Sequence, residues 1–129
     1  MIFVDTTFIL GLAIDNDQWH DNAIKLISKV EKSKRWISNI ILTETLNGLT
    51  GIMDGKEIEN MYNLMGNNYN IYIVDETLQK KAIKITKQYN GMLGYADCTC
   101  IAIMEELGIH EIISFDEHFD NKKGIIRIY

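Results

Sequence analysis

Two aspartates stand directly behind apolar segments, where a purely structural protein has little need of a charge. Asp5 follows the apolar run Met1–Val4, and Asp116 follows the run Glu111–Ser114 by two residues. Both runs predict buried strands, so both carboxylates are expected at the carboxyl edge of a sheet. Oxygen ligands of this kind suit Mg²⁺ or Mn²⁺. Taken singly, each aspartate also has an ordinary interpretation, Asp5 as the N-cap of the next helix and Asp116 as a turn residue.

Two further acids lie on predicted helices, close to the apolar faces of those helices. Glu44 falls four residues after Ile40, and Asp97 falls three residues before Cys100. At these spacings two side chains share one side of a helix. Glu44 alone is also typical of a partly exposed helix glutamate, with Asn47 one turn further on the same side. Asp97 instead begins an apolar stripe, and because a buried carboxylate without a counterion costs several kcal/mol, we expect a positive group to meet it.

Alternating strands and helices must position these acids. The predicted strands are Met1–Val4, Trp36–Ile37, Asn70–Val74, Glu111–Ser114 and Ile125–Tyr129. The predicted helices are Thr7–Ala13, Asp17–Lys32 with Asp17 as its cap, Ile40–Leu49 capped by Ser38 or Asn39, Lys56–Met65 followed by the loop Gly66–Asn68, Glu76–Tyr89 ended at Asn90-Gly91, and Tyr95–Leu107 ended at Gly108. Strands separated by helices that can cross back imply parallel pairing. The sequence therefore predicts the α/β class, as a three-layer α/β/α sandwich with a mainly parallel central sheet.

Length and composition indicate one globular domain. The chain has 129 residues, 47% of them hydrophobic, against a prior of roughly 150 residues per domain. No uninterrupted apolar stretch is long enough for a membrane span, and the apolar start lacks a basic leader, so a cytoplasmic protein is expected. The net charge of −5 argues against gripping nucleic acid by bulk positive charge. Two bound divalent cations would bring that charge close to neutral.

The cysteines and histidines do not predict zinc. Cys98 and Cys100 are two residues apart, which does not suit a disulfide, and on one helix they point in different directions. No C-x-x-C or H-x-x-x-H spacing includes them or His20, His110 and His118. We interpret the thiols as reduced and all five side chains as packing residues.

Several consecutive blocks resemble a known family. MIFVDTTFILGLAI, DQWHDNA, ILTETLNGL, GYADCTCIAIMEELGI and IISFDEHF are similar to the successive blocks of a PIN domain, of the kind found in VapC-type toxins of toxin–antitoxin pairs. The resemblance covers essentially the whole chain and implies a single PIN-like nuclease domain over residues 1–129. Its most specific part is the ordered series of four acids, Asp5, Glu44, Asp97 and Asp116.

The resemblance assigns expected roles residue by residue. Asp5 matches the family's first metal-binding aspartate, Glu44 its helix glutamate, Asp97 its third acid and Asp116 its fourth. Ser114 stands where the family has a small hydroxyl residue. His20 and Ala23 match a recurrent block of the family that begins at Asp17. Thr6, Ser114 and Asn47 are candidates for contact with the substrate or for support of the metal ligands. Phe115 departs from the family, which commonly has a basic or polar residue there, and this departure could alter substrate contact.

The implied activity is that of a metal-dependent endoribonuclease that leaves a 5′-phosphate and a 3′-hydroxyl. Phosphodiester cleavage needs an activated water and neutralisation of charge on the phosphoryl group, and one or two Mg²⁺ ions, or Mn²⁺, can supply both. Asp5 and Asp97 would hold the principal ion, while Glu44 and Asp116 would complete a second site or orient the water. The resemblance also implies an RNA substrate, a cognate antitoxin and a homodimer, with no membrane partner.

The four acids are also compatible with two other functions. The same four acids would serve a PIN-fold nuclease that processes RNA outside any toxin pair. A catalytically silent RNA- or protein-binding PIN domain is a further alternative, although binding alone needs no cluster of unpaired carboxylates. A haloacid dehalogenase-type phosphatase needs a second aspartate where this chain has Thr7, and a receiver domain needs an acid pair and a lysine that are not evident.

Overall fold

A five-stranded parallel sheet forms the centre of the molecule. The computed structural model describes residues 1–129, and its sheet has the strand order β3-β2-β1-β4-β5. All four pairings are parallel, with Phe3 opposite both Trp36 and Ile112. The strands are β1 (Ile2–Val4), β2 (Arg35–Ser38), β3 (Asn70–Tyr72), β4 (Glu111–Ile113) and β5 (Ile126–Ile128).

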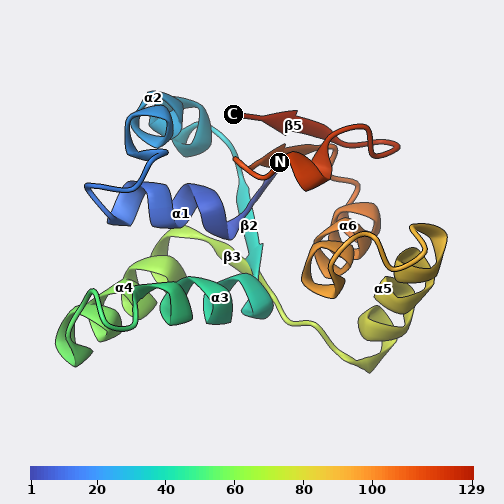
Figure 1. The fold of residues 1–129 in the computed structure, drawn as a ribbon, viewed down its shortest axis with the longest axis horizontal. Coiled ribbons are helices and arrows are strands. Elements are labelled where there is room, and N and C mark those ends of the chain that lie inside the picture. The colour runs from blue at the N-terminus through green and yellow to red at the C-terminus, as the bar shows by residue number, and fades with distance from the viewer.

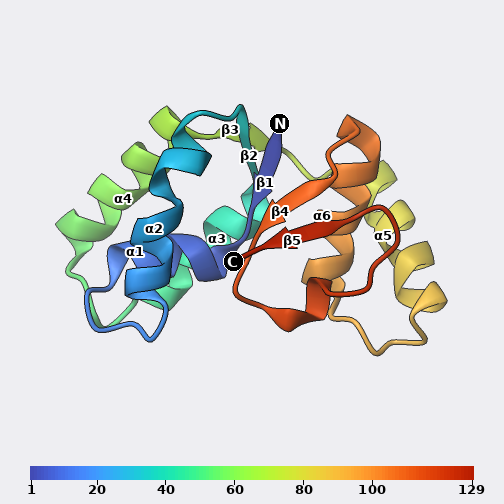
Figure 2. The ribbon, with the colours of Figure 1, turned by 90° about the horizontal axis from the view of Figure 1, so that it is seen from above.

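Six helices cover the two faces of this sheet. They are α1 (Thr6–Ala13), α2 (His20–Glu31), α3 (Asn39–Leu49), α4 (Gly55–Asn68), α5 (Glu76–Gln88) and α6 (Tyr95–Leu107), with a short 3₁₀ helix, η1, at Glu117–Phe119. Figure 1 and Figure 2 show α1 to α4 on one side of the strands and α5 with α6 on the other. The three-layer α/β/α fold is therefore confirmed. No helix combines the length and the apolar character needed to cross a membrane.

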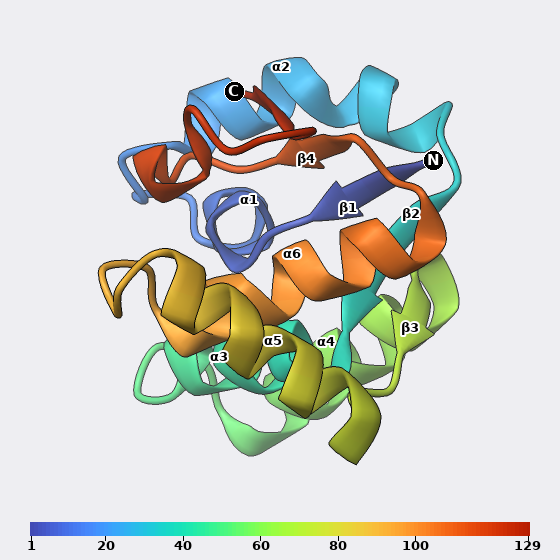
Figure 3. The same cartoon turned by 90° about the vertical axis from the view of Figure 1, so that its right-hand side faces the viewer.

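The change of face follows from the order of the strands. The chain steps outward from β1 to β2 and β3, then returns across the sheet to β4 on the other side of β1. Because crossovers between parallel strands are right-handed, reversing direction moves the connecting helices to the opposite face. Figure 3 shows α5 and α6 side by side on that face. The reversal places the switch point between β1 and β4, where α/β proteins usually bind their ligands.

The core lies around the two central strands. Phe3 and Val4 of β1 and Ile112 and Ile113 of β4 have no exposed surface, as expected for strands covered on both faces. Cys98 and Cys100 are free thiols buried in the same core, so their interpretation as packing residues is confirmed. This packing fixes the strand ends from which the acidic loops depart.

Two predicted helix boundaries are wrong. Asp17 does not cap α2, because its side chain accepts a hydrogen bond from the Trp19 backbone (2.8 Å) in a turn that precedes the helix. Helix α4 also continues through the predicted loop Gly66–Asn68. Met65 is buried, and the Asn68 side chain donates to the Leu64 carbonyl (2.7 Å), so the helix is held beyond the point where glycine and asparagine favour a break.

Strand β3 ends at Tyr72, two residues before the predicted end at Val74, whereas three predicted helix ends agree with the structure. Ser38 caps α3 by accepting from the Ile41 backbone (3.1 Å). Helix α6 spans the predicted residues and ends at Gly108, whose φ of 67° is left-handed. Asn90 and Gly91 after α5 also have positive φ, which breaks the chain before α6.

Candidate metal centre

Asp5 and Asp116 both lie at the carboxyl ends of the two central strands. Asp5 is the first residue after β1, and its backbone N–H donates to the Ile113 carbonyl at the end of β4 (3.0 Å). Asp5 occupies the N-cap position of α1 but forms no capping hydrogen bond with its side chain. The interpretation of Asp5 as an ordinary helix cap is therefore wrong, and its carboxylate is used elsewhere.

Two hydroxyl groups hold the Asp5 carboxylate, and we call Asp5, Thr7 and Ser114 the buried half of the site. Ser114 Oγ donates to Asp5 Oδ2 at 2.7 Å, and Thr7 Oγ1 donates to the same oxygen at 2.8 Å. The two hydroxyls in turn accept from backbone N–H groups, Ser114 from Asp116 (3.0 Å) and Thr7 from Phe115 (3.0 Å). Asp5 is only 5% exposed. The loop after β4 is thus bonded to the acid after β1.

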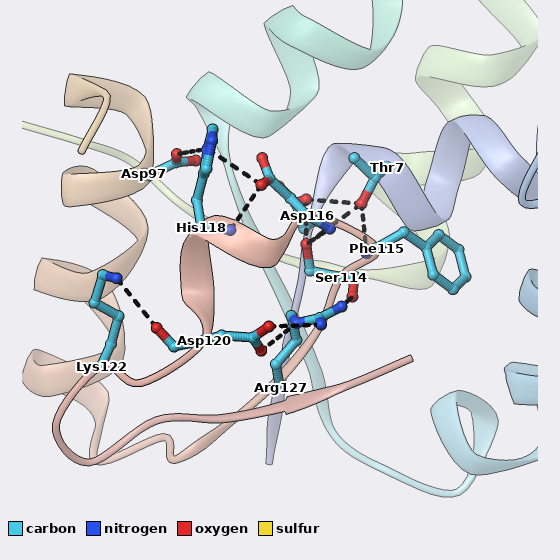
Figure 4. A network of polar contacts seen from close by, with 10 residues as sticks. Thr7, Asp97, Ser114, Phe115, Asp116, His118, Asp120, Lys122 and Arg127 are labelled. Carbon is cyan, nitrogen blue, oxygen red and sulfur yellow. Dashed lines mark hydrogen bonds and ion pairs between the residues drawn. The ribbon is translucent and has the colours of Figure 1, made fainter. Parts of the chain in front are cut away.

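Asp97, Asp116 and His118 form the open half of the site. One potential ligand atom from each lies within 4.8 Å of the other two. His118 Nδ1 is 3.1 Å from Asp116 Oδ1 and 3.3 Å from Asp97 Oδ2, and the side chain of His118 is 66% exposed (Figure 4). Asp97 lies on the first turn of α6, as predicted, and Asp116 caps η1 by accepting from the His118 backbone (2.9 Å). Solvent therefore reaches this half directly.

Glu44 is joined to the site through its neighbour on α1. Thr6 Oγ1 donates to Glu44 Oε2 at 3.0 Å, and Thr6 is adjacent to Asp5 in the chain. Glu44 and Asp5 lie outside the close group that Asp97, Asp116 and His118 form. Asn47, one turn further along α3, is exposed, and no hydrogen bond connects its side chain to the acids.

Burial and mutual repulsion disfavour the charged forms of these acids. The pKa of Asp97 rises to about 6, chiefly because the side chain is desolvated, then because Asp5 and Asp116 are close, with His118 partly offsetting the rise. Burial also raises the pKa of Asp5 against the hydrogen bonds from Ser114 and Thr7, and a smaller contribution from Asp116 raises it further. The pKa of Glu44 rises through burial, opposed by the Thr6 hydrogen bond and raised again by Asp5.

No lysine or arginine compensates these charges. None forms an ion pair with Asp5, Glu44, Asp97 or Asp116, and His118 is the only basic side chain that contacts any of them. One exposed imidazole cannot balance several carboxylates that raise one another's pKa. The arrangement therefore has an excess of negative charge and of oxygen donors, which is the property of a divalent cation site.

Three residues near the acids behave differently from the sequence interpretation. His118 is not a packing residue but lies exposed between two acids, a role that its position two residues after Asp116 could have suggested. No pattern in the sequence points to Thr7, because its role depends on a contact with the loop after β4, whose Phe115 N–H donates to its hydroxyl. Phe115 is 6% exposed and stacks on Trp19 with ring centroids 5.2 Å apart, so its ring packs in the core.

A separate apolar groove of about 320 Å³ lies between α1, α2 and α4. Its walls are mainly hydrophobic, and Glu31 and Arg35 are the two charged residues that line it. Ile9 and Leu12 of α1 and Leu64 of α4 are among the residues that line it. None of the four acids belongs to its lining.

Comparison with known proteins places this geometry in a family. The sequence matches the PIN domain family over residues 2–125. No match is found among curated protein sequences. Among solved structures, VapC20 of Mycobacterium tuberculosis, described as a sarcin-ricin loop cleaving toxin, has a TM-score of 0.78 and 24% identity, covering 91% of each chain.

Two complexes are also similar. A toxin–antitoxin complex from Klebsiella pneumoniae has a TM-score of 0.72 at 14% identity, over 98% of this chain and 96% of that one. VapBC2 of Rickettsia felis, bound to a DNA fragment from its promoter, has a TM-score of 0.71 at 13% identity, over 99% and 98%. Identities this low show a shared fold, whereas the family match spans nearly all of the sequence, including the four acids at the edge of the sheet. The chain belongs to the PIN domain family.

Proposed function

We propose that this chain is a divalent-metal-dependent endoribonuclease and the toxin of a VapBC-type toxin–antitoxin pair. The observation that carries the proposal is the group of carboxylates at the β1/β4 switch point that lacks any lysine or arginine partner. Membership of the PIN domain family supports nuclease chemistry at that place. RNA as the substrate is the inference that we draw from the likeness to a toxin described as cleaving the sarcin-ricin loop.

The residues present fit Mg²⁺ or Mn²⁺. Asp5, Asp97 and Asp116 offer carboxylate oxygens, which are the donors that hard divalent cations prefer, and their repulsion is relieved by positive charge. A bound ion would neutralise charge on the phosphoryl group and make a water molecule nucleophilic at neutral pH. His118 adds a nitrogen donor that Mn²⁺ accepts more readily than Mg²⁺ does.

The chain's own groups divide the work of holding and orienting. Both hydroxyls that bind Asp5 donate to Oδ2, so we assign the ligand role to Oδ1. Asp97 and Asp116 provide the opposite wall of the site, and we assign Glu44, held by Thr6, to a second ion or to orienting the water. The Ser114 hydroxyl is occupied by Asp5 and by the Asp116 backbone, so we assign it to support of the ligands and not to phosphate contact.

A cleavage assay tests this function. Purified protein is incubated with 5′-labelled RNA in Mg²⁺, in Mn²⁺ and in EDTA, alongside Asp97→Asn and the matched surface variant Asp21→Asn, whose residue is exposed on α2. We expect metal-dependent products with a 5′-phosphate and a 3′-hydroxyl from the wild type and from Asp21→Asn, and none from Asp97→Asn. Products that form equally in EDTA, or undiminished cleavage by Asp97→Asn, would contradict the proposal. RNA binding without products would favour the silent binding domain instead.

The antitoxin partner is proposed from the structural neighbours and the groove. Two of those neighbours are toxin–antitoxin complexes, and the apolar groove between α1, α2 and α4 suits the apolar face of a partner helix. Co-expression with the adjacent reading frame tests this point. We expect that the partner no longer neutralises the toxicity of Leu64→Asp, a variant in the groove. Tyr62 is exposed on the same helix but does not line the groove, so Tyr62→Asp should still be neutralised. If the partner neutralised the toxicity of both variants equally, it would bind outside the groove, and docking of a partner helix there would be contradicted.

A further inference from the structure

Arg127 is a nearly buried cation that does not contact any of the four acids. It lies in the middle of β5, and its side chain is 7% exposed. Its Nε donates to Asp120 Oδ1 at 2.6 Å and its Nη2 to Asp120 Oδ2 at 2.9 Å, while Nη1 donates to the Ser114 carbonyl at 3.2 Å (Figure 4). One guanidinium therefore ties together the beginning and the end of the loop that carries Asp116 and His118.

Both backbone groups of Ser114 are held from β5. Its N–H donates to the Ile128 carbonyl at 3.1 Å, and its carbonyl accepts from Arg127. Strand β4 ends one residue earlier, at Ile113, and the Ser114 N–H makes the last bond of its ladder with β5, whereas the Ser114 carbonyl lies beyond the ladder and is held by the Arg127 side chain. With its backbone fixed, Ser114 points its hydroxyl at Asp5 and accepts the Asp116 N–H. The orientation of this hydroxyl is thus set from β5.

The pairing of Arg127 with Asp120 is better suited to orientation than to stability. Asp120 is 42% exposed, and exposed ion pairs contribute little to the free energy of unfolding. A bidentate guanidinium–carboxylate pair instead fixes the relative direction of its two partners, which a lysine cannot do. The Tyr129 ring centroid lies 3.8 Å from the guanidinium carbon and adds a further contact on the guanidinium. Each contact restrains the same side chain.

We propose that Arg127, with Asp120, is a positioning residue that holds the loop 114–120 so that Ser114 orients Asp5 and Asp116. The catalytic part of this inference rests on the proposed nuclease function, whereas the positioning part does not. Arg127 binds the Ser114 carbonyl at the start of the loop and the Asp120 carboxylate at its end. We call this set of contacts the clamp. The clamp acts through Ser114 and never touches the substrate.

Amide hydrogen exchange tests the positioning directly and needs no enzymatic activity. The N–H groups of Phe115 and Asp116 donate to Thr7 and Ser114, so their exchange reports whether the loop is held. We expect exchange at both amides to rise about 10- to 100-fold in Arg127→Met and in Asp120→Asn, with the α6 core amides unchanged. Unchanged protection at both amides in Arg127→Met overturns the proposal, whatever the RNA assay gives.

Steady-state kinetics then tests the consequence. We expect kcat to fall about 10- to 100-fold in Arg127→Met and Asp120→Asn with KM for RNA within about threefold, because support of metal ligands is lost and RNA contacts are kept. Arg127→Lys should recover little, and the double variant should be no worse than Arg127→Met. Lys81→Met, which removes the Lys81–Glu106 pair between α5 and α6, is the control and should keep full kcat.

The outcomes separate the two proposals. Faster exchange with unchanged kcat overturns the catalytic part of the clamp inference and leaves the nuclease function standing. A wild type that cleaves no RNA in any divalent metal overturns the nuclease function, and the exchange result still decides whether the clamp holds the loop.

Discussion

The two halves of the acidic site control negative charge in different ways. In the buried half, Asp5 is held by neutral donors, since the hydroxyls of Thr7 and Ser114 both bind one of its oxygens. In the open half, Asp97 and Asp116 both lie beside His118. The repulsion of Asp97 by Asp5 and Asp116 exceeds its attraction to His118. Neutral donors fix a carboxylate in place without cancelling its charge. On the proposed function, the half around Asp5 is organised in advance, and the half around Asp97 and Asp116 would be completed by a cation.

The largest expected effect comes from variants of Asp5 that separate the role of its negative charge from the role of its hydrogen bonds. Asp5→Asn keeps a hydrogen-bond acceptor for the two hydroxyls but loses the charge, so we expect RNA cleavage to fall by roughly 10³-fold or more with no loss of stability. Asp5→Ala removes the acceptor as well and should cost about 1–3 kcal/mol in the free energy of unfolding. Urea denaturation and cleavage rates measure the two effects. A destabilised Asp5→Asn would show that charge and scaffold cannot be separated here.

The next effect concerns the link between the two halves. Ser114→Ala removes the 2.7 Å bond to Asp5 and the acceptor of the Asp116 N–H. We expect a loss of about 10- to 100-fold in cleavage or in Mn²⁺ affinity, which is usual when the support of a metal ligand is removed. Electron paramagnetic resonance titration of Mn²⁺ checks the affinity. Ser114→Thr, which keeps the hydroxyl, is the matched control, and an unchanged Mn²⁺ affinity in Ser114→Ala would make the two halves independent.

A smaller effect concerns the pH dependence of stability that Asp97 of the open half contributes. The pKa of Asp97 is about 6 in the folded protein and about 4 unfolded. Because the folded state holds this proton more tightly, the contribution to stability is complete below pH 4 and is lost as pH rises through 6. We expect the metal-free protein to lose about 1–2 kcal/mol between pH 4.5 and 7.5 on this account, after allowing for solvent screening.

Denaturation midpoints at several pH values measure this loss. The loss should be smaller in Asp97→Asn, and divalent cation added at pH 7.5 should restore stability to the wild type alone. The Asp5 and Glu44 shifts have the same sign and leave a residual pH dependence in the variant. Identical profiles for the two proteins would contradict the repulsion that the open half displays.

The smallest effect is expected at Asn47, which belongs to neither half. Its side chain is exposed on α3 and forms no hydrogen bond with the acids. We expect Asn47→Ala to change cleavage by less than about twofold and stability by less than about 0.5 kcal/mol, as for an ordinary surface substitution. A tenfold loss of cleavage would restore the sequence interpretation that Asn47 supports the site, and would enlarge the open half.

The sequence predicted those parts of the site that depend on local pattern. Apolar runs that end in an acid predict Asp5 and Asp116 at strand ends, and parallel strands bring such ends to one edge. Helical spacing likewise predicts that Asp97 faces inward at the start of α6. The α/β/α architecture follows from the same periodicities, because the alternation of strands and helices leaves few topologies.

Contacts between distant segments could not be predicted in this way. Thr7 matters because β4 lies beside β1, which places the Phe115 N–H over its hydroxyl. Arg127 and Asp120 meet only because β5 pairs with β4 and η1 turns the chain back. Helix α4 continues past Gly66 although glycine and asparagine favour a break there, with Met65 buried in the core and the Asn68 side chain bonded to the Leu64 carbonyl. In each case tertiary packing decided what the local sequence left open.

Anomalous diffraction from crystals soaked in Mn²⁺ would show whether the acids of the site hold a divalent cation. We expect a peak within bonding distance of carboxylate oxygens from Asp97 and Asp116, next to Asp5, that disappears in Asp97→Asn crystals soaked in the same way. A saturating soak that leaves these carboxylates without a peak, in a protein whose fold is intact, would contradict the proposed cation site.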